Sequence, residues 1–158
     1  MLTGIILAGG KSTRMGQDKA VLLSNVSRLQ SELKIAGCDE VIIMCGTPQR
    51  ADLFSGNCKP DPESNLAHSL LTIIENIEGE IQLAPCDAYL ADASFFKSVN
   101  GVPVDDLGNR QPLLSRFATS TNLVRSKKIS EVFVNIQSCE GGIKARNFNT
   151  PEEFKEIQ

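Results

Sequence analysis

The sequence predicts an α/β fold in which a mostly parallel sheet lies between two layers of helices. Three short apolar runs, 2–8, 41–44 and 81–84, are bounded by glycine, proline or polar residues, which is typical of buried strands. The stretches 27–36 and 66–77 between them repeat apolar residues every three to four positions, as amphipathic helices do. Strands that alternate with helices along a chain predict a parallel sheet covered on both faces.

Shorter elements are expected in the remainder of the chain. The stretches 56–65 and 105–108 are rich in turn-forming residues, and Pro151 suits the first turn of a closing helix. The other expected elements, in order, are a turn or short helix at 49–53, a helix at 92–99, a strand at 102–104, a mostly helical stretch over 112–128, a strand at 131–136 and the closing helix at 151–157.

The composition is ordinary for a soluble globular protein, and 158 residues suit one domain, 1–158. A net charge of −3 argues against a broad nucleic-acid surface, and no apolar run reaches the length of a membrane span. The first apolar run lacks a basic region before it, so we do not expect a signal peptide. Five cysteines without C-x-x-C spacing indicate neither a disulfide framework nor a zinc site, and predict a reduced, cytoplasmic setting.

The first predicted strand runs directly into a glycine pair, Gly9 and Gly10. Three basic residues follow, Lys11, Arg14 and Lys19, and no acidic residue occurs before position 18. Glycines let the backbone approach a ligand closely, and backbone N–H groups with Lys or Arg side chains suit a polyphosphate. The spacing fits neither the P-loop nor the dinucleotide fingerprint. The alternative is a flexible glycine turn with solvated lysines, but the strand before it and the bases after it favour a phosphate site.

Asp87 follows the strand predicted at 81–84, just as the glycine loop follows the strand at 2–8. Parallel strands end at one edge of the sheet, where α/β proteins bind ligands, so we expect Asp87 to face the phosphate loop. A carboxylate beside a triphosphate is what Mg²⁺ requires, although a turn or helix-capping role explains Asp87 equally well from the residues alone. Cys86 has no visible base partner and is expected to be a small buried residue.

Residues 7–19 resemble the signature loop of the nucleotidyltransferase family typified by molybdenum cofactor guanylyltransferase. The shared pattern is Leu7-Ala8-Gly9-Gly10-x-Ser12-x-Arg14-Met15-Gly16-x-Asp18-Lys19. The resemblance implies a Rossmann-like sheet of the nucleotide-diphospho-sugar transferase type, with Arg14 and Lys19 as catalytic residues on the phosphates and the main chain near Leu7 and Ala8 touching the base. The residues that it implies for nucleotide binding are Leu7, Ala8, Gly9, Gly10, Lys11, Ser12, Arg14 and Lys19.

Further segments extend the resemblance along the chain. The tripeptide 85–87 is similar to the family's strand-end aspartate, which implies that Asp87 is catalytic and holds Mg²⁺. Residues 147–153 resemble the family's C-terminal motif, which implies a metal-site role for Asn147 beside a cap for the last helix. Asp61 stands where the family has an aspartate that contacts the guanine base. Residues 111–113 are similar to a segment near the acceptor, and a turn before a helix explains them equally well.

The resemblance implies an enzyme that transfers GMP from GTP to molybdopterin and releases pyrophosphate, with Mg²⁺ as its cofactor. The product would then pass to molybdoenzymes or their chaperones. Neither nucleic acid nor a membrane is an expected partner. Two other reactions stay open, transfer from CTP and transfer to a sugar phosphate. The loop at 7–19 does not determine which nucleotide base is bound. A nucleotide-binding homologue without catalysis also stays open, because the segment 59–68 departs from the family's glycine-proline-rich loop.

Overall fold

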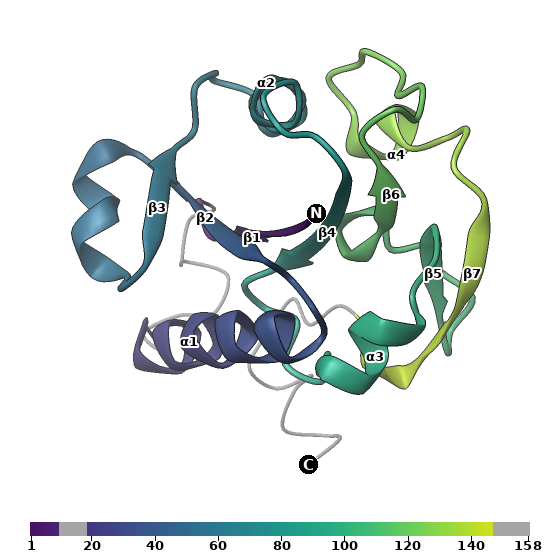
Figure 1. Ribbon diagram of the computed structural model, residues 1–158, viewed down its shortest axis with the longest axis horizontal. Helices are drawn as coiled ribbons and strands as arrows, with labels where there is room; N and C mark the ends of the chain where they lie inside the picture. The colour runs from purple at the N-terminus through teal and green to yellow at the C-terminus, as the bar shows by residue number, and fades with distance from the viewer. Residues whose placement is uncertain (10–18, 147–158) are drawn as a thin grey trace.

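The computed structural model describes residues 1–9 and 19–146, apart from the side chains of 19–21. A five-stranded sheet lies at the centre of the described chain, in the order β3, β2, β1, β4, β6 (Figure 1). The strands are β1 (Leu2–Leu7), β2 (Glu40–Gly46), β3 (Asn57–Pro60), β4 (Glu80–Pro85) and β6 (Arg116–Ala118). The first four run parallel, and β6 lies antiparallel to β4 at one end of the sheet. The predicted α/β fold with a mostly parallel sheet is therefore confirmed.

Helices cover both faces of this sheet (Figure 1). One face carries α1 (Lys19–Ile35) and α3 (Ala93–Ser98), and the other carries α2 (Leu66–Ile74) and α4 (Ile129–Val132). Because successive residues of a strand point to opposite faces, Ile6 and Ala8 join the core with α1, whereas Ile5 and Leu7 join the core with α2. Burial on both faces explains why β1 is an unbroken apolar run in the sequence.

A second, smaller sheet stands beside the first. It consists of the parallel strands β5 (Val102–Asp105) and β7 (Ser138–Gly142). Gly101 and Arg116 exchange two backbone hydrogen bonds, of 2.9 and 3.0 Å, and so join this sheet to the β6 edge. Three short 3₁₀ helices complete the described elements: η2 (Pro48–Leu53), η3 (Pro112–Leu114) and η4 (Ile143–Ala145). The strand expected at 102–104 is confirmed.

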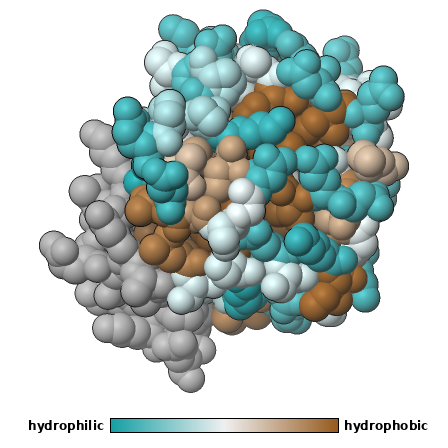
Figure 2. Space-filling view, turned by 60° about the vertical axis from the view of Figure 1, so that its left-hand side comes forward, coloured by the Kyte–Doolittle hydropathy of each residue, from teal (hydrophilic) through white to brown (hydrophobic). Residues whose placement is uncertain are grey.

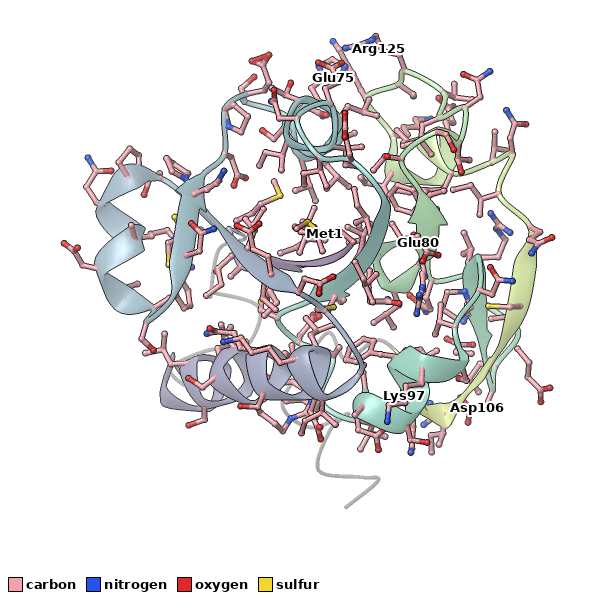
Figure 3. The ribbon with its side chains drawn as sticks, viewed as in Figure 1. Met1, Glu75, Glu80, Lys97, Asp106 and Arg125 are labelled. Atoms are coloured by element: carbon pink, nitrogen blue, oxygen red, sulfur yellow. The ribbon has the colours of Figure 1, made fainter. Side chains whose placement is uncertain are left out.

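The helix expected over 112–128 is wrong. Only η3 is helical there, β6 follows at 116–118, and residues 119–128 contain neither helix nor strand. Tertiary pairing overrides the apolar pattern, because Phe117 pairs with Ile81 of β4 and buries its ring against that of Phe133. Within the irregular segment, Arg125 forms an exposed ion pair with Glu75, the residue that follows α2, and the two lie together in Figure 3.

The strand expected at 131–136 is also wrong. The structure places α4 at 129–132, and turns follow it. Alternation of Val132, Val134 and Ile136 predicted a strand, but Val134 is 60% exposed while Phe133 is fully buried. Burial of Val132, Phe133 and Ile136, with Ile129 packed against them, follows helical spacing.

Several boundaries also differ from the prediction. α1 begins at Lys19 rather than at residue 27, and α2 ends at Ile74 rather than at 77. The turn-rich stretch 56–65 contains strand β3, whose residues are exposed or only partly buried. A short, polar edge strand that ends in proline carries no apolar signal, so the composition hid it. The closing helix expected at 151–157 lies outside the described residues.

On the face that Figure 2 shows, patches of apolar side chains alternate with hydrophilic ones. Among the side chains that the structure describes, the exposed large apolar ones come from distant parts of the chain: Met1, Ile35, Leu53, Leu66, Leu107, Val134 and Ile143. Single apolar residues at a surface are normal and need no partner. Among the described helices, none combines the length and the hydropathy that crossing a membrane would require.

Candidate functional site

The ends of β1 and β4 lie side by side at the edge of the sheet where the parallel strands terminate, here called the carboxyl edge. Leu7 is in register with Pro85, and the Cys86 N–H donates to the Leu7 carbonyl at 3.0 Å. On the other side, the Ala8 N–H donates to the Met44 carbonyl at 2.8 Å. The chain therefore enters the glycine loop from between β2 and β4, and Asp87 follows β4 at the same edge, as the sequence predicted.

Gly9 is packed against the end of β2. A Cβ atom on Gly9 would lie 2.9 Å from both Cα and N of Gly46 and 3.0 Å from Oδ2 of Asp61. Gly46 itself has φ +87°, a conformation that favours glycine. These two glycines thus bring the start of the loop into backbone contact with the neighbouring strand, which no larger residue at position 9 allows.

Asp61 lies at this contact, although it follows β3, which is separated from β1 by β2. Its Oδ1 accepts from the Gly46 N–H at 3.0 Å, and its own N–H donates to the Gly46 carbonyl at 2.7 Å. The aspartate therefore braces the turn after β2 and presents Oδ2 toward Gly9. The structure brings Asp61 to the start of the loop, and its contact with a nucleotide base stays a prediction.

Arg50, in η2, belongs to the same edge and was missed by the sequence argument. Its Nη2 donates to the Ala8 carbonyl and its Nε to the Cys45 carbonyl, both at 2.9 Å. The guanidinium thus ties the end of β2 to the residue before the glycine loop. A lone basic residue in a short helix directly after a strand end was the only signal, and it does not reveal which carbonyls the side chain reaches.

The segment after β4 is held from α1. Asn25 and Arg28 donate hydrogen bonds to carbonyls within residues 86–91, on either side of Asp87. Both residues were missed: Asn25 lies before the helix predicted at 27–36, and Arg28, inside that helix, was given no role. Other polar residues of α1 have the same spacing of three, so the sequence alone does not single out this pair.

The environment of Cys86 disfavours the ionised form of its thiol. Burial, and then the charge of the adjacent Asp87, raise the pKa of the Cys86 thiol to about 12. A thiol with such a pKa is protonated at neutral pH and reacts poorly. Its side chain packs against the core beneath α1, in agreement with the expected role of a small filler.

The comparison with known families agrees with this geometry. Residues 4–101 match the MobA-like NTP transferase domain. This chain belongs to that family. A molybdenum cofactor guanylyltransferase of Xanthomonas euvesicatoria is 32% identical over 98 residues, 58% of this chain and 50% of that protein. A probable molybdenum cofactor guanylyltransferase of Nostoc sp. is 46% identical over 67 residues, 40% of this chain and 32% of that protein. The chain therefore spans half the length or less of these curated relatives.

The fold of this MobA-like domain also has counterparts among solved structures. A nucleotidyl transferase from Methanothermobacter thermautotroptrophicus superposes with a TM-score of 0.71, over 99% of this chain and 95% of that chain. The two are 16% identical, so the likeness shows the fold alone. That fold is the nucleotide-diphospho-sugar transferase type that the signature loop implied.

The donor set of this MobA-like domain suits magnesium bound together with a nucleotide. Among the described residues, no three histidine, cysteine, aspartate or glutamate side chains form a group that could hold a metal. Magnesium commonly takes one or two carboxylates, with phosphate oxygens and water in the remaining positions. A strand-end carboxylate, Asp87, beside the start of the phosphate loop fits this mode of binding.

Some predicted site residues lie outside the described part of the chain: Gly10, Lys11, Ser12, Arg14 and Asn147. Lys19 is the first residue of α1, and only its backbone is described. Gln111 precedes η3 and donates through Nε2 to Oδ2 of Asp105 at 2.9 Å, so it supports the turn at 105–111. Residues 112 and 113 belong to η3 itself, and the contact of 111–113 with an acceptor stays a prediction.

Proposed function

We propose that this chain transfers GMP from GTP to molybdopterin, with release of pyrophosphate. Membership of the MobA-like NTP transferase family supports a nucleotidyl transfer, and the names of the curated relatives favour the guanylyl reaction. The observation that carries the proposal is the meeting of two strand ends. Cys86 binds the Leu7 carbonyl through its N–H, and so Asp87 follows β4 beside the entrance to the glycine loop.

The residues at the carboxyl edge would hold the nucleotide rather than perform covalent chemistry. Nucleotidyl transfer depends chiefly on positioning and on neutralising charge. Hydrogen bonds to Met44 and Arg50 fix the peptide groups around Ala8, from which the loop starts. Lys11, Arg14 and Lys19 would then neutralise the triphosphate. Magnesium held by Asp87 would supply further positive charge beside the phosphate oxygens.

The acceptor supplies its own nucleophile. A phosphate monoester, with a second pKa of about 6, is largely ionised at pH 7, so no side chain has to remove a proton. One of its oxygens bonds to the α-phosphorus of GTP as the bond from that phosphorus to the bridging oxygen breaks. The electron pair of the broken bond leaves with pyrophosphate. All five cysteines are free thiols, which suits the cytoplasm, where we place the reaction and a hand-over to molybdoenzymes or their chaperones.

Thermal unfolding with GTP, CTP, UTP, ATP and dTTP, each with and without Mg²⁺, tests the base. A bound nucleotide raises Tm by mass action, so GTP with Mg²⁺ should give the largest increase. A larger increase with CTP would overturn the guanylyl assignment and favour a cytidylyl transfer. Binding of GTP without pyrophosphate release in the presence of molybdopterin would favour a nucleotide-binding homologue without catalysis.

Asp87→Asn tests the site itself, with Asp39→Asn as its matched control. Asp39 accepts from the Leu2 N–H at 2.9 Å, at the opposite edge of the sheet, and an asparagine there can still accept. We expect Asp87→Asn to abolish Mg²⁺-dependent pyrophosphate release while Asp39→Asn retains it. Equal activity of the two variants would refute the role of Asp87.

A further inference from the structure

Two side chains of α1 form hydrogen bonds with the backbone on either side of Asp87. Asn25 donates through Nδ2 to the carbonyls of Cys86, at 2.7 Å, and Ala88, at 3.4 Å. Arg28 donates to the Ala88 carbonyl through Nη2 at 2.8 Å and to the Ala91 carbonyl through Nη1 at 2.6 Å. The two donors therefore bind the residues immediately before and after Asp87, and the turn that follows.

The two side chains also hold each other. Arg28 Nε donates to Asn25 Oδ1 at 2.9 Å, which leaves the amide only one orientation in which Nδ2 faces the carbonyls. Asn25 is 5% exposed, so its amide is shielded from water and needs the hydrogen bonds to Arg28 and to the carbonyls of Cys86 and Ala88. Burial lowers the pKa of the Arg28 guanidinium, and the charges of Glu32 and Asp92 act in the opposite direction. The half-buried guanidinium and the buried amide thus both donate to the same short segment, residues 86–91.

Apolar side chains at these two positions would leave the carbonyls of Cys86, Ala88 and Ala91 without these donors, so the pair stabilises the fold. The same hydrogen bonds also fix the path of a backbone that lies outside regular structure. We propose that Asn25 and Arg28 are positioning residues that set the Asp87 carboxylate for the magnesium–nucleotide complex, an inference that rests on the proposed function.

The helix that carries the pair also starts at the phosphate loop. α1 runs without a break from Lys19, and Asn25 lies six residues, or about 9 Å, along its axis. One rigid element therefore joins the end of the loop that should bind the triphosphate to the segment that should bind the metal. Residues that orient a metal ligand commonly change metal affinity or activity by about 10- to 100-fold when they are replaced.

The test is Asn25→Asp, with Gln30→Glu as the matched control. Both variants replace an amide with a carboxylate on α1, and Gln30 Nε2 also donates to a backbone carbonyl, that of Ser55, at 2.9 Å. Ser55 follows η2 and is remote in sequence from the segment at 86–91. Asn25→Asp sets an acceptor oxygen against the Cys86 and Ala88 carbonyls, whereas Gln30→Glu disturbs only the Ser55 contact. Arg28→Lys is a second variant, which keeps the charge but loses the planar guanidinium that donates to both the Ala88 and the Ala91 carbonyl.

GTP binding is measured by calorimetry across a Mg²⁺ titration, and pyrophosphate release across the same series. We expect Asn25→Asp and Arg28→Lys to need at least about 10-fold more Mg²⁺ for half-maximal GTP binding. Their GTP affinity in the absence of Mg²⁺ should be unchanged. Gln30→Glu should follow the unmodified protein. Unmodified protein that shows no effect of Mg²⁺ on GTP binding would refute the proposed function.

Two further outcomes would refute the positioning role while the proposed function stands. One is a Mg²⁺ requirement in both variants equal to that of the unmodified protein. The other is an equal loss of GTP binding with and without Mg²⁺, because a merely structural effect would weaken both. Should Asn25→Asp fail to fold, Arg28→Lys decides between these results.

Discussion

Gly9→Ala is expected to destabilise the fold and to weaken nucleotide binding together. The added Cβ would lie 2.9 Å from Cα and N of Gly46, and both are backbone atoms that no change of rotamer can move. The turn after β2 would have to shift, and with it the two hydrogen bonds between Gly46 and Asp61. Overpacking of this kind costs about 1–3 kcal/mol. For a domain of this size, each kcal/mol lowers Tm by about 2–4 °C.

Gly4→Ala is the control, because Gly4 lies in β1, the strand that leads to Gly9. A Cβ on Gly4 would meet Leu33 Cδ1 at 3.1 Å and Cys38 Sγ at 3.2 Å, which are side-chain atoms at longer distances than the backbone atoms that face Gly9. Thermal unfolding of both variants, with and without GTP and Mg²⁺, separates the two cases. We expect Gly9→Ala to lower Tm by roughly 2–12 °C and to lose most of the increase that GTP gives, with Gly4→Ala milder in both. A Gly9→Ala protein as stable and as responsive to GTP as Gly4→Ala would contradict the close-contact argument.

Two other predictions follow from the described contacts. Arg50→Met leaves the Ala8 and Cys45 carbonyls without their donor and should lower the free energy of unfolding in urea by about 1–3 kcal/mol, with only partial recovery in Arg50→Lys. Burial would raise the pKa of the Asp105 carboxyl, but hydrogen bonds from the Asn109 N–H, Gln111 and the Leu107 N–H together lower it. Its stabilising contribution is therefore complete above the unfolded-state pKa of about 3.9 and is lost as pH falls through the lower folded-state pKa. The stability difference from Asp105→Asn should thus shrink between pH 7 and pH 3, and a constant difference would contradict this linkage.

The central elements were predictable because their physics is local. A strand buried on both faces is an apolar run, and a helix over a sheet repeats its apolar residues with the helical period, so β1, β2, β4 and α2 could be read from residue order. The shared edge of the loop and Asp87 followed from the direction of parallel strands alone. None of these inferences required knowledge of which side chains meet.

The C-terminal third could not be predicted in the same way. Phe117 lies in an antiparallel edge strand because it pairs with Ile81 and meets the ring of Phe133, a contact that sequence order does not show. The alternation at 132, 134 and 136 predicted a strand, whereas the structure uses the helical spacing that the same stretch also contains. Where two periods coexist in a short segment, packing decides between them.

The residues missed at the site share one physical cause. Strands that end at the carboxyl edge leave peptide carbonyls of the following loops without a sheet partner, and buried carbonyls need donors. Arg50, Asn25 and Arg28 supply those donors from helices, across 42 to 63 residues of chain. Motif matching finds the groups that should touch the nucleotide, but it does not find the donors that fix the backbone on which those groups stand. A homologue that keeps the loop at 7–19 and Asp87 but loses these donors would therefore carry the family's signature on a site whose geometry is no longer held.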